Sequence, residues 1–379
     1  MDNINSEWAH LLYPIERLQK DIIAANELTS FAEANYMVKT FYTMQELRKA
    51  SVMQEKELRK ATKPCNVAPY MTAQYKTLET SLKLGIEKFA SEQPIGQWML
   101  RLYGIGPILS ANMLSHIDIN RINNYGHLVA YAGMTATPPT WGKGMKRPFN
   151  ADFKTAVWKV GDTMMKFSSH PKCVHGHYYL HHKAREWRRN LNGELTQYAA
   201  EQLTRKTYDK NTDAYFWYSG QVSAEAAAEY HRRLNLEGAH DVKGRIDFIL
   251  EQMGEDKITQ AEIAELQIEL DLLKGNEPDI KAIMADTGGT GVPMLPPAHL
   301  VSRAKRKVGV LFLSHLYEVW AGIEKGQSID PYPMAQMGHE DYIPPPYYDR
   351  ANLKVSNKLW PDGIERVIYA FPKTREAIE

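Results

Sequence analysis

The sequence lacks three features that would assign a protein class at once. It has only two cysteines, Cys65 and Cys173, which are too few and too far apart for a disulfide framework and fit a reducing compartment. It has no run of the ~18 apolar residues that a membrane span needs, and its first residues do not form a basic and then apolar leader. It has no excess of either charge, because 46 basic residues stand against 45 acidic ones. We therefore expect a cytoplasmic protein without membrane contact, in which any strongly charged surface comes from local segregation of charge.

Alternation of apolar and polar residues, which indicates half-buried strands, is also scarce. Apolar residues instead recur at steps of three and four, and 44% of all residues are hydrophobic, which predicts a mainly all-α protein with true cores. The predicted parts are a helical hairpin arm at 1–94, a helix-hairpin-helix domain at 95–190, an inserted helical subdomain at 191–286, a linker and basic helix at 287–329 that complete the second part, and a Pro/Tyr-rich tail at 330–379. We expect the tail to be irregular and to lie on the surface, with a small β-hairpin that turns at 361–363.

Two apolar stripes indicate two long helices in the first part. The first stripe is Met37, Phe41, Met44 and Leu47, and the second is Tyr75, Leu78, Leu82, Ile86 and Phe89. Residues 63–66, which include Pro64, break the run between them. We expect the two helices to pair antiparallel. The sequence leaves open whether this arm is a spacer or joins copies of the chain into a homo-oligomer.

The stretch 102–132 carries a turn bracketed by glycines. Gly104 and Gly106 flank Ile105, and Pro107 suits the first turn of a helix. Free backbone amides at such a helix start favour an anion, so the candidate contacts to phosphate are Gly104, Gly106, Ile108 and Leu109. We expect this helix to dock through Leu109, Met113, Leu114 and Ile117 on Leu128, Val129 and Ala132 of the next one. The pattern predicts a helix-hairpin-helix that grips a nucleic-acid backbone, and the other interpretation is an ordinary αα-hairpin whose glycines only cap and pack.

Cations gather in three places after this turn. A loop rich in Gly and Pro at 133–148 brings Lys143, Lys146 and Arg147 beside Trp141. This composition suits a phosphate backbone or an unstacked base, and the other interpretation is a solvated surface loop. The next residues predict an amphipathic helix with Phe153, Val157, Val160, Met164 and Phe167 on its apolar face. Further candidate contacts to nucleic acid are Lys183, Arg185, Arg188, Arg189, Arg303, Lys305, Arg306 and Lys307.

A cluster of potential zinc ligands lies between these cations. It comprises Cys173, His175, His177, His181 and His182. A closed structural site usually pairs two short ligand clusters, and the second cluster is missing here. We therefore expect no metal site, and expect these histidines to pack or to face phosphate.

The order of the pieces resembles a known arrangement. Residues 103–111 (YGIGPILSA), residues 128–134 (LVAYAGM), the Gly/Lys loop and the late AKRK segment at 304–307 resemble the C-terminal domain of a large family of insertion-sequence transposases. That family pairs an N-terminal RuvC-like DEDD nuclease domain with a C-terminal helix-hairpin-helix domain. The resemblance implies DNA recombination with a serine nucleophile, four carboxylates and a structured guide RNA. It therefore implies DNA as a partner, with structured RNA as a further candidate, in a prokaryotic or phage setting.

Two departures argue against catalysis by this chain. The first 95 residues show no strands that could carry the metal-binding carboxylates of a two-metal site. Where the family carries its serine, this chain has Thr140 between stiffening prolines and Trp141. The preferred interpretation is thus a transposase-related DNA-binding protein that is catalytically inactive and needs no cofactor. The alternatives are an active recombinase, with Mg²⁺ and either Thr140 or a partner nuclease chain, and a structural or assembly protein.

Overall fold

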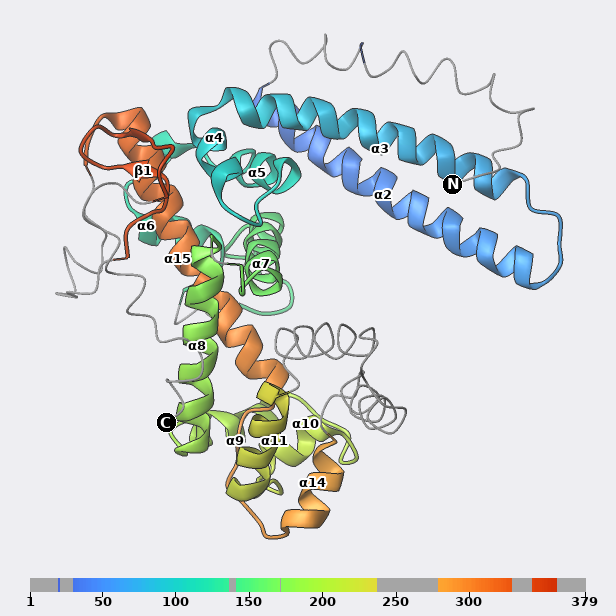
Figure 1. Cartoon of the computed structure of the whole chain (residues 1–379), viewed down its shortest axis with the longest axis vertical. Coiled ribbons are helices and arrows are strands. Elements are labelled where there is room, and N and C mark those ends of the chain that lie inside the picture. Colours follow the sequence, from blue (N-terminus) through green and yellow to red (C-terminus); the bar gives the residue numbers. More distant parts are fainter. Residues whose placement is uncertain are drawn as a thin grey trace, which may run out of the picture. The chain divides into compact units, whose positions relative to one another are not determined.

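The computed structural model describes residues 20, 30–135, 141–170, 172–236, 279–328 and 343–359. Helices make up nearly all of the regular structure of these residues, so the all-α prediction is confirmed (Figure 1). The chain divides into two compact units, one of Met1–Tyr179 with Lys305–Phe371 and the other of Leu180–Ala304 with Pro372–Glu379. The five-part division expected from the sequence stays a prediction. No described helix is both long and apolar enough to span a membrane.

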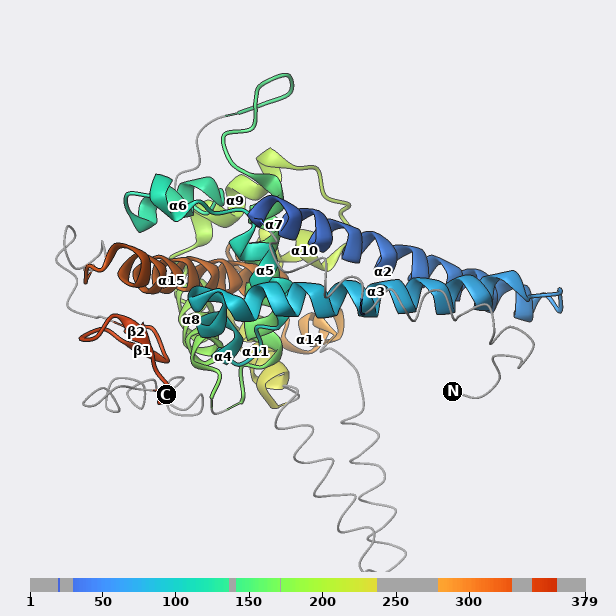
Figure 2. The ribbon, with the colours of Figure 1, turned by 90° about the horizontal axis from the view of Figure 1, so that it is seen from above.

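The first unit begins with the predicted pair of long helices. They are α2 (Phe31–Lys60) and α3 (Val67–Glu92), which lie side by side in both views (Figures 1 and 2). Ser30 starts α2 through a capping box, since its hydroxyl accepts from the Glu33 amide and its own amide donates to the Glu33 carboxylate. The break between the helices falls where Pro64 lies, as the sequence predicts.

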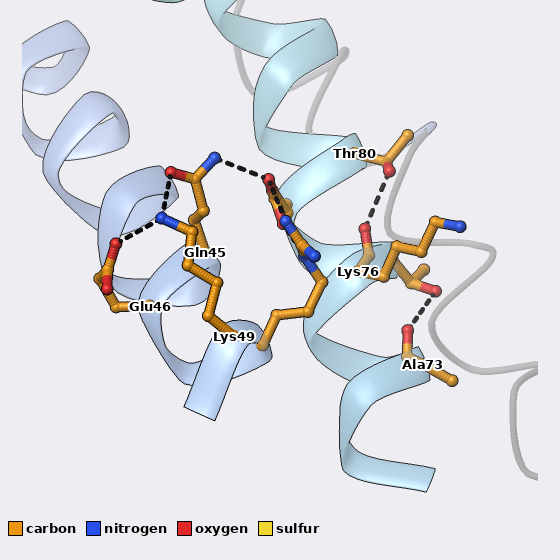
Figure 3. A network of polar contacts seen from close by, with 9 residues as sticks. Gln45, Glu46, Lys49, Ala73, Lys76 and Thr80 are labelled. Carbon is orange, nitrogen blue, oxygen red and sulfur yellow. Dashed lines mark hydrogen bonds and ion pairs between the residues drawn. The ribbon is translucent and has the colours of Figure 1, made fainter. Parts of the chain in front are cut away.

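Polar side chains add to the apolar contact between α2 and α3. Glu79 of α3 accepts from Arg48 Nε at 2.6 Å and from Gln45 Nε2 at 3.2 Å. Lys49 donates to Gln45 and Glu46, which lie in the same helix, α2 (Figure 3). Leu47, the last residue of the predicted stripe, is 39% exposed, so the contact between α2 and α3 does not bury it fully.

Short helices and one longer helix follow in the first unit. They are α4 (Pro94–Arg101), α5 (Pro107–Leu114), the 3-10 helix η3 (Ile119–Arg121), α6 (Tyr125–Tyr131) and α7 (Ala151–Lys166). The apolar face predicted for α7 is confirmed at Phe153, Val157, Val160 and Met164, which are fully buried. Phe167 follows the helix, is 42% exposed and packs edge-on against the ring of Tyr103.

The described part of the C-terminal tail is more buried than the sequence predicts. It forms a two-stranded antiparallel hairpin of β1 (Tyr348–Asp349) and β2 (Lys354–Val355). The Pro346 carbonyl accepts from Trp98 Nε1 of α4 at 2.7 Å, and the Tyr348 side chain is 2% exposed. This segment therefore closes part of the core instead of lying on the surface. The hairpin turn predicted at 361–363 lies outside the described residues.

The second unit is a small helical core of its own. It contains α9 (Thr196–Arg205), α10 (Asp213–Tyr218), α11 (Ala224–Leu236), α14 (Ile280–Thr287) and parts of α8 (Val174–Leu191) and α15 (Pro297–Lys325). Its buried aromatic residues include Trp187, Trp217, Tyr218 and Tyr230. The part of the chain predicted as an inserted helical subdomain, 191–286, is helical at α9, α10, α11 and α14, and its residues 237–278 lie outside the described residues.

Candidate nucleic-acid interface

The glycine-bracketed turn connects α4 to α5 in the first unit. Gly104 has a φ of +95°, and a Cβ atom there would lie 3.1 Å from Thr163 Cγ2 and 3.2 Å from Phe167 Cδ2. The positive φ and the close approach both favour glycine. Gly106 is the exposed N-cap of α5, and its carbonyl accepts from the Ser110 amide at 3.0 Å. The turn is therefore held against the C-terminal end of α7.

The packing of α5 differs from the predicted docking on α6. Leu109, Met113, Leu114 and Ile117 are buried as expected. However, the helices that pack extensively against α5 are α2, α3, α4 and α7. The helix across the glycine turn from α5 is α4, because the turn lies between these two helices and they contact each other. Whether this arrangement works as a helix-hairpin-helix on nucleic acid stays a prediction.

Residues 141–149, called the basic loop below, carry exposed candidate contacts. Trp141 is 43% exposed, and Lys143, Lys146 and Arg147 are exposed too. The Arg147 guanidinium lies 5.3 Å from the centroid of the Trp141 ring and 5.7 Å from that of Phe149. The two rings meet edge to face at 6.2 Å. Of the three cations predicted beside Trp141, the structure places Arg147 against its ring.

The two ends of the loop are fastened to each other. The Asn150 amide donates to the Tyr131 carbonyl at 2.9 Å, and Asn150 Nδ2 donates to the Tyr131 hydroxyl at 2.7 Å. Gly133 has a φ of +61°, and a Cβ atom there would lie 2.7 Å from Phe149 Cγ. Arg306 of α15 donates to the carbonyls of Met134 and Thr135. These contacts fix the base of the loop, whereas its cationic tip is exposed.

Lys154 is a residue at this place that the sequence did not single out. It lies in the first turn of α7, and its Nζ lies 4.4 Å from the centroid of the Phe149 ring. Burial lowers the pKa of the Lys154 ammonium, and the charges of Arg306 and Arg147 lower it further. Its position one helical turn after the loop is the only signal that the sequence offers. The structure thus gathers Arg147, Lys154 and Arg306 at the base of the basic loop.

The glycine turn and the basic loop lie at different ends of α7. The turn packs on Thr163 and Phe167, whereas Phe149 of the basic loop packs on Lys154. The nearest of these contacts, at Lys154 and Thr163, are nine residues apart, which is about 14 Å along a helix. The two candidate phosphate contacts are therefore separate places on the first unit.

Lys305 of α15 forms an ion pair within the first unit. Its Nζ lies 2.7 Å from Asp162 Oδ1 of α7. Lys307 is exposed. Thr140, the candidate nucleophile, lies outside the described residues.

Carboxylates balance much of the positive charge in the second unit. Arg303 and Arg189 both donate to Glu186, whose side chain is 2% exposed, and Arg189 also lies 2.9 Å from Glu194. Burial favours the neutral form of Glu186, but the hydrogen bonds and charges of Arg303 and Arg189 outweigh it and hold the pKa of the carboxyl below its ordinary value. Burial lowers the pKa of Lys183. Arg185 and Arg188 are exposed.

The cysteine and histidine cluster is mostly a packing feature. Cys173 Sγ lies 3.7 Å from Met164 Sδ, and burial raises the pKa of its thiol to about 11. His175 Nε2 lies 3.0 Å from His315 Nδ1, and His315 Nε2 lies 2.8 Å from the Ile343 carbonyl oxygen. Burial lowers the pKa of His315 to about 4, so the pair is neutral near pH 7. Among the described residues, no group of three or more His, Cys, Asp or Glu side chains is arranged to hold a metal ion.

A comparison with protein families finds a similarity for one segment of the chain. Neither curated proteins nor solved structures give a match to the chain. Residues 97–147, which run from α4 through the glycine turn to Arg147 of the basic loop, match the model of the transposase IS116/IS110/IS902 family. The match confirms, for this segment, the resemblance predicted from the residues.

Proposed function

We propose that this transposase-related chain binds DNA through the phosphate backbone, with little sequence preference, and does not itself catalyse recombination. The observation that carries the proposal is the charge of the basic loop. Lys143, Lys146 and Arg147 are exposed, and no carboxylate of the described residues pairs with them. Exposed cations of this kind beside the exposed Trp141 suit contacts to phosphate and sugar, which hold a duplex without reading its bases.

Two further observations support the absence of catalysis by this chain. The described part of the first 94 residues consists of α2 and α3 and contains no strand, so it offers no converging carboxylates for a two-metal site. The loop segment that carries the family's serine has Thr140 and no serine in this sequence. In this proposal, binding does not require Mg²⁺. The glycine turn at Gly104 and Gly106 provides a second contact to the DNA backbone.

A salt titration of binding tests the proposal. Fluorescence anisotropy with duplex, branched and single-stranded DNA, and with RNA, should give a dissociation constant that rises steeply with KCl. The combined change Lys143→Ala, Lys146→Ala and Arg147→Ala should reduce the slope of log K against log salt by about 2–3. A matched control, with Lys56→Ala, Lys76→Ala and Lys83→Ala on the exposed faces of α2 and α3, removes the same charge and should keep most of the slope.

Three results would contradict parts of the proposal. Binding that does not weaken with salt, or that weakens equally in both triple variants, would remove the role of the basic loop. Mg²⁺-dependent nicking of supercoiled or branched DNA, or a covalent adduct that is lost in Thr140→Ala, would show an active recombinase. Absence of binding at low salt, together with stable oligomers in light scattering, would indicate a structural or assembly protein.

A further inference from the structure

The base of the basic loop brings together cations from three different elements of the first unit. Arg147 lies in the basic loop, Lys154 lies in the first turn of α7, and Arg306 lies on α15. Arg147 and Lys154 share one aromatic neighbour, since their cationic groups lie 5.7 Å and 4.4 Å from the centroid of the Phe149 ring. This shared neighbour holds the two charges close together.

Arg306 contacts the chain shortly after α6, next to the glycine on which the Phe149 ring packs. It donates to the carbonyls of Met134 and Thr135, which directly follow Gly133. The Phe149 ring packs on Gly133 so closely that no Cβ atom would fit there. The charges of Arg306 and Arg147 both lower the pKa of Lys154, which agrees with this placement.

The acidic residues of α7 do not balance this charge. Asp152 Oδ2 lies 3.3 Å from Lys39 Nζ, and Asp162 Oδ1 lies 2.7 Å from Lys305 Nζ. Neither Arg147 nor Lys154 has an ion pair with a carboxylate of the described residues. The repulsion between Arg147 and Lys154 is thus left without a compensating anion from the described part of the chain.

We propose that Arg147, Lys154 and Arg306 together bind one phosphate group of the nucleic-acid backbone. A phosphodiester offers oxygen acceptors to a guanidinium fork and to an ammonium, and its negative charge offsets their mutual repulsion. The inference rests on the proposed function and adds to it the place of one fixed phosphate. Lys154 is half-buried and lies over a ring, so it positions this phosphate, whereas the exposed tip lysines make looser contacts.

The first test compares two lysines of α7. Lys154→Met should weaken binding of duplex DNA roughly 5- to 10-fold at moderate salt and reduce the salt slope by about one. Lys166→Met is the matched control, because Lys166 is exposed on the same helix, and it should leave affinity and slope unchanged. Lys154→Arg, which keeps the charge, should retain most of the affinity. Circular dichroism melts establish that the variants fold. Equal affinity and slope for Lys154→Met and the wild type would overturn the phosphate site while the proposed function stands.

The second test uses inorganic phosphate as the probe and needs no nucleic acid. In the full chain with labelled lysine, the pKa of Lys154, assigned with Lys154→Met, is followed by NMR in phosphate and in chloride at equal ionic strength. Phosphate should raise this pKa, and Arg147→Gln should abolish the rise. A pKa that is the same in both salts would overturn the site. A rise in a chain that binds no nucleic acid would support the site and refute the proposed function, so the two failures are distinguishable.

Discussion

Two groups of cations look alike in the sequence and differ in their surroundings. In the second unit, Arg189 and Arg303 donate to the buried carboxylate of Glu186. In the first unit, Arg147 and Lys154 lie over aromatic rings and form no ion pair within the described residues. The difference teaches that a run of basic residues does not by itself predict available charge, because a single buried carboxylate can accept hydrogen bonds from two arginines.

This difference bears directly on binding. An arginine that already pairs with a carboxylate must give up that partner before it neutralises a phosphate, so it releases fewer counterions per contact. We therefore expect the basic loop, and not Arg189 or Arg303, to determine how binding depends on salt. Substitutions in the paired arginine cluster should therefore affect stability, and substitutions in the basic loop should affect binding.

The largest expected effect comes from Glu186→Gln. The change removes the charge that holds Arg189 and Arg303, and the partially exposed arginines recover part of the loss from water. We expect the free energy of unfolding to fall by about 2–3 kcal/mol at pH 7, measured by urea denaturation. Glu194→Gln, at a side chain that is 50% exposed, should cost less than about 0.5 kcal/mol. Equal losses of unfolding free energy in Glu186→Gln and Glu194→Gln would show that the buried carboxylate does not hold the arginines more strongly than the exposed one.

The same residue predicts a dependence on pH. The pKa of Glu186 is lower in the folded protein than in the unfolded chain, so its contribution is complete above the ordinary pKa of a glutamate, about 4.3. It is lost as the pH falls through the lower, folded value. The stability difference between wild type and Glu186→Gln should therefore shrink in that acidic range.

A smaller effect is expected at the base of the basic loop. Gly133→Ala forces a side chain into a position with a φ of +61° and against the Phe149 ring. We expect a loss of roughly 1–2 kcal/mol in thermal or urea unfolding, together with weaker nucleic-acid binding, because Arg147 and Lys154 depend on that ring. Gly142→Ala is the matched control, since a Cβ atom there meets nothing within 4 Å. If Gly133→Ala is destabilised but binds nucleic acid normally, the positions of the cations do not depend on the Phe149 ring.

The smallest effect is expected for Tyr131→Phe. The change removes the 2.7 Å hydrogen bond from Asn150 Nδ2 and keeps the backbone bond between the same two residues. We expect a loss of about 0.5–1 kcal/mol in urea unfolding. Tyr103→Phe, whose hydroxyl has no hydrogen bond among the described residues, should change nothing measurable. A loss no larger than that of Tyr103→Phe would mean that the backbone bond alone closes the loop.

The sequence predicts the helices well and their partners less well. The buried face of α7 and the break at Pro64 follow from periodicity and from the missing amide of proline, which are local properties. The docking of α5 on α2, α3, α4 and α7 and the hydrogen bond from Trp98 to the Pro346 carbonyl join distant parts of the chain. No local pattern reports such contacts, so the tail was expected on the surface.

In the candidate site, too, contacts between residues near in sequence could be predicted, and contacts between distant residues could not. Trp141 and Arg147 are near in sequence, and their contact could be predicted. The pairing of Glu186 with Arg189 at a spacing of three also has a local signal, although the basic residues around it obscure that signal. The approach of Arg303 to Glu186 and of Arg306 to Met134 depends on the fold. Lys154 becomes a candidate only because Phe149 lies beneath it.

The closed base of the basic loop has a consequence for variation and engineering. Because Asn150 joins back to Tyr131, the chain leaves and re-enters the first unit at nearly the same point. Insertions or exchanges at the exposed tip near Gly142 and Gly144 then cost little beyond loop entropy, which grows slowly with length. The tip can thus be replaced without a change in the core of the first unit. Segments from other proteins, or a fluorescent label, could be inserted there to change what this unit contacts.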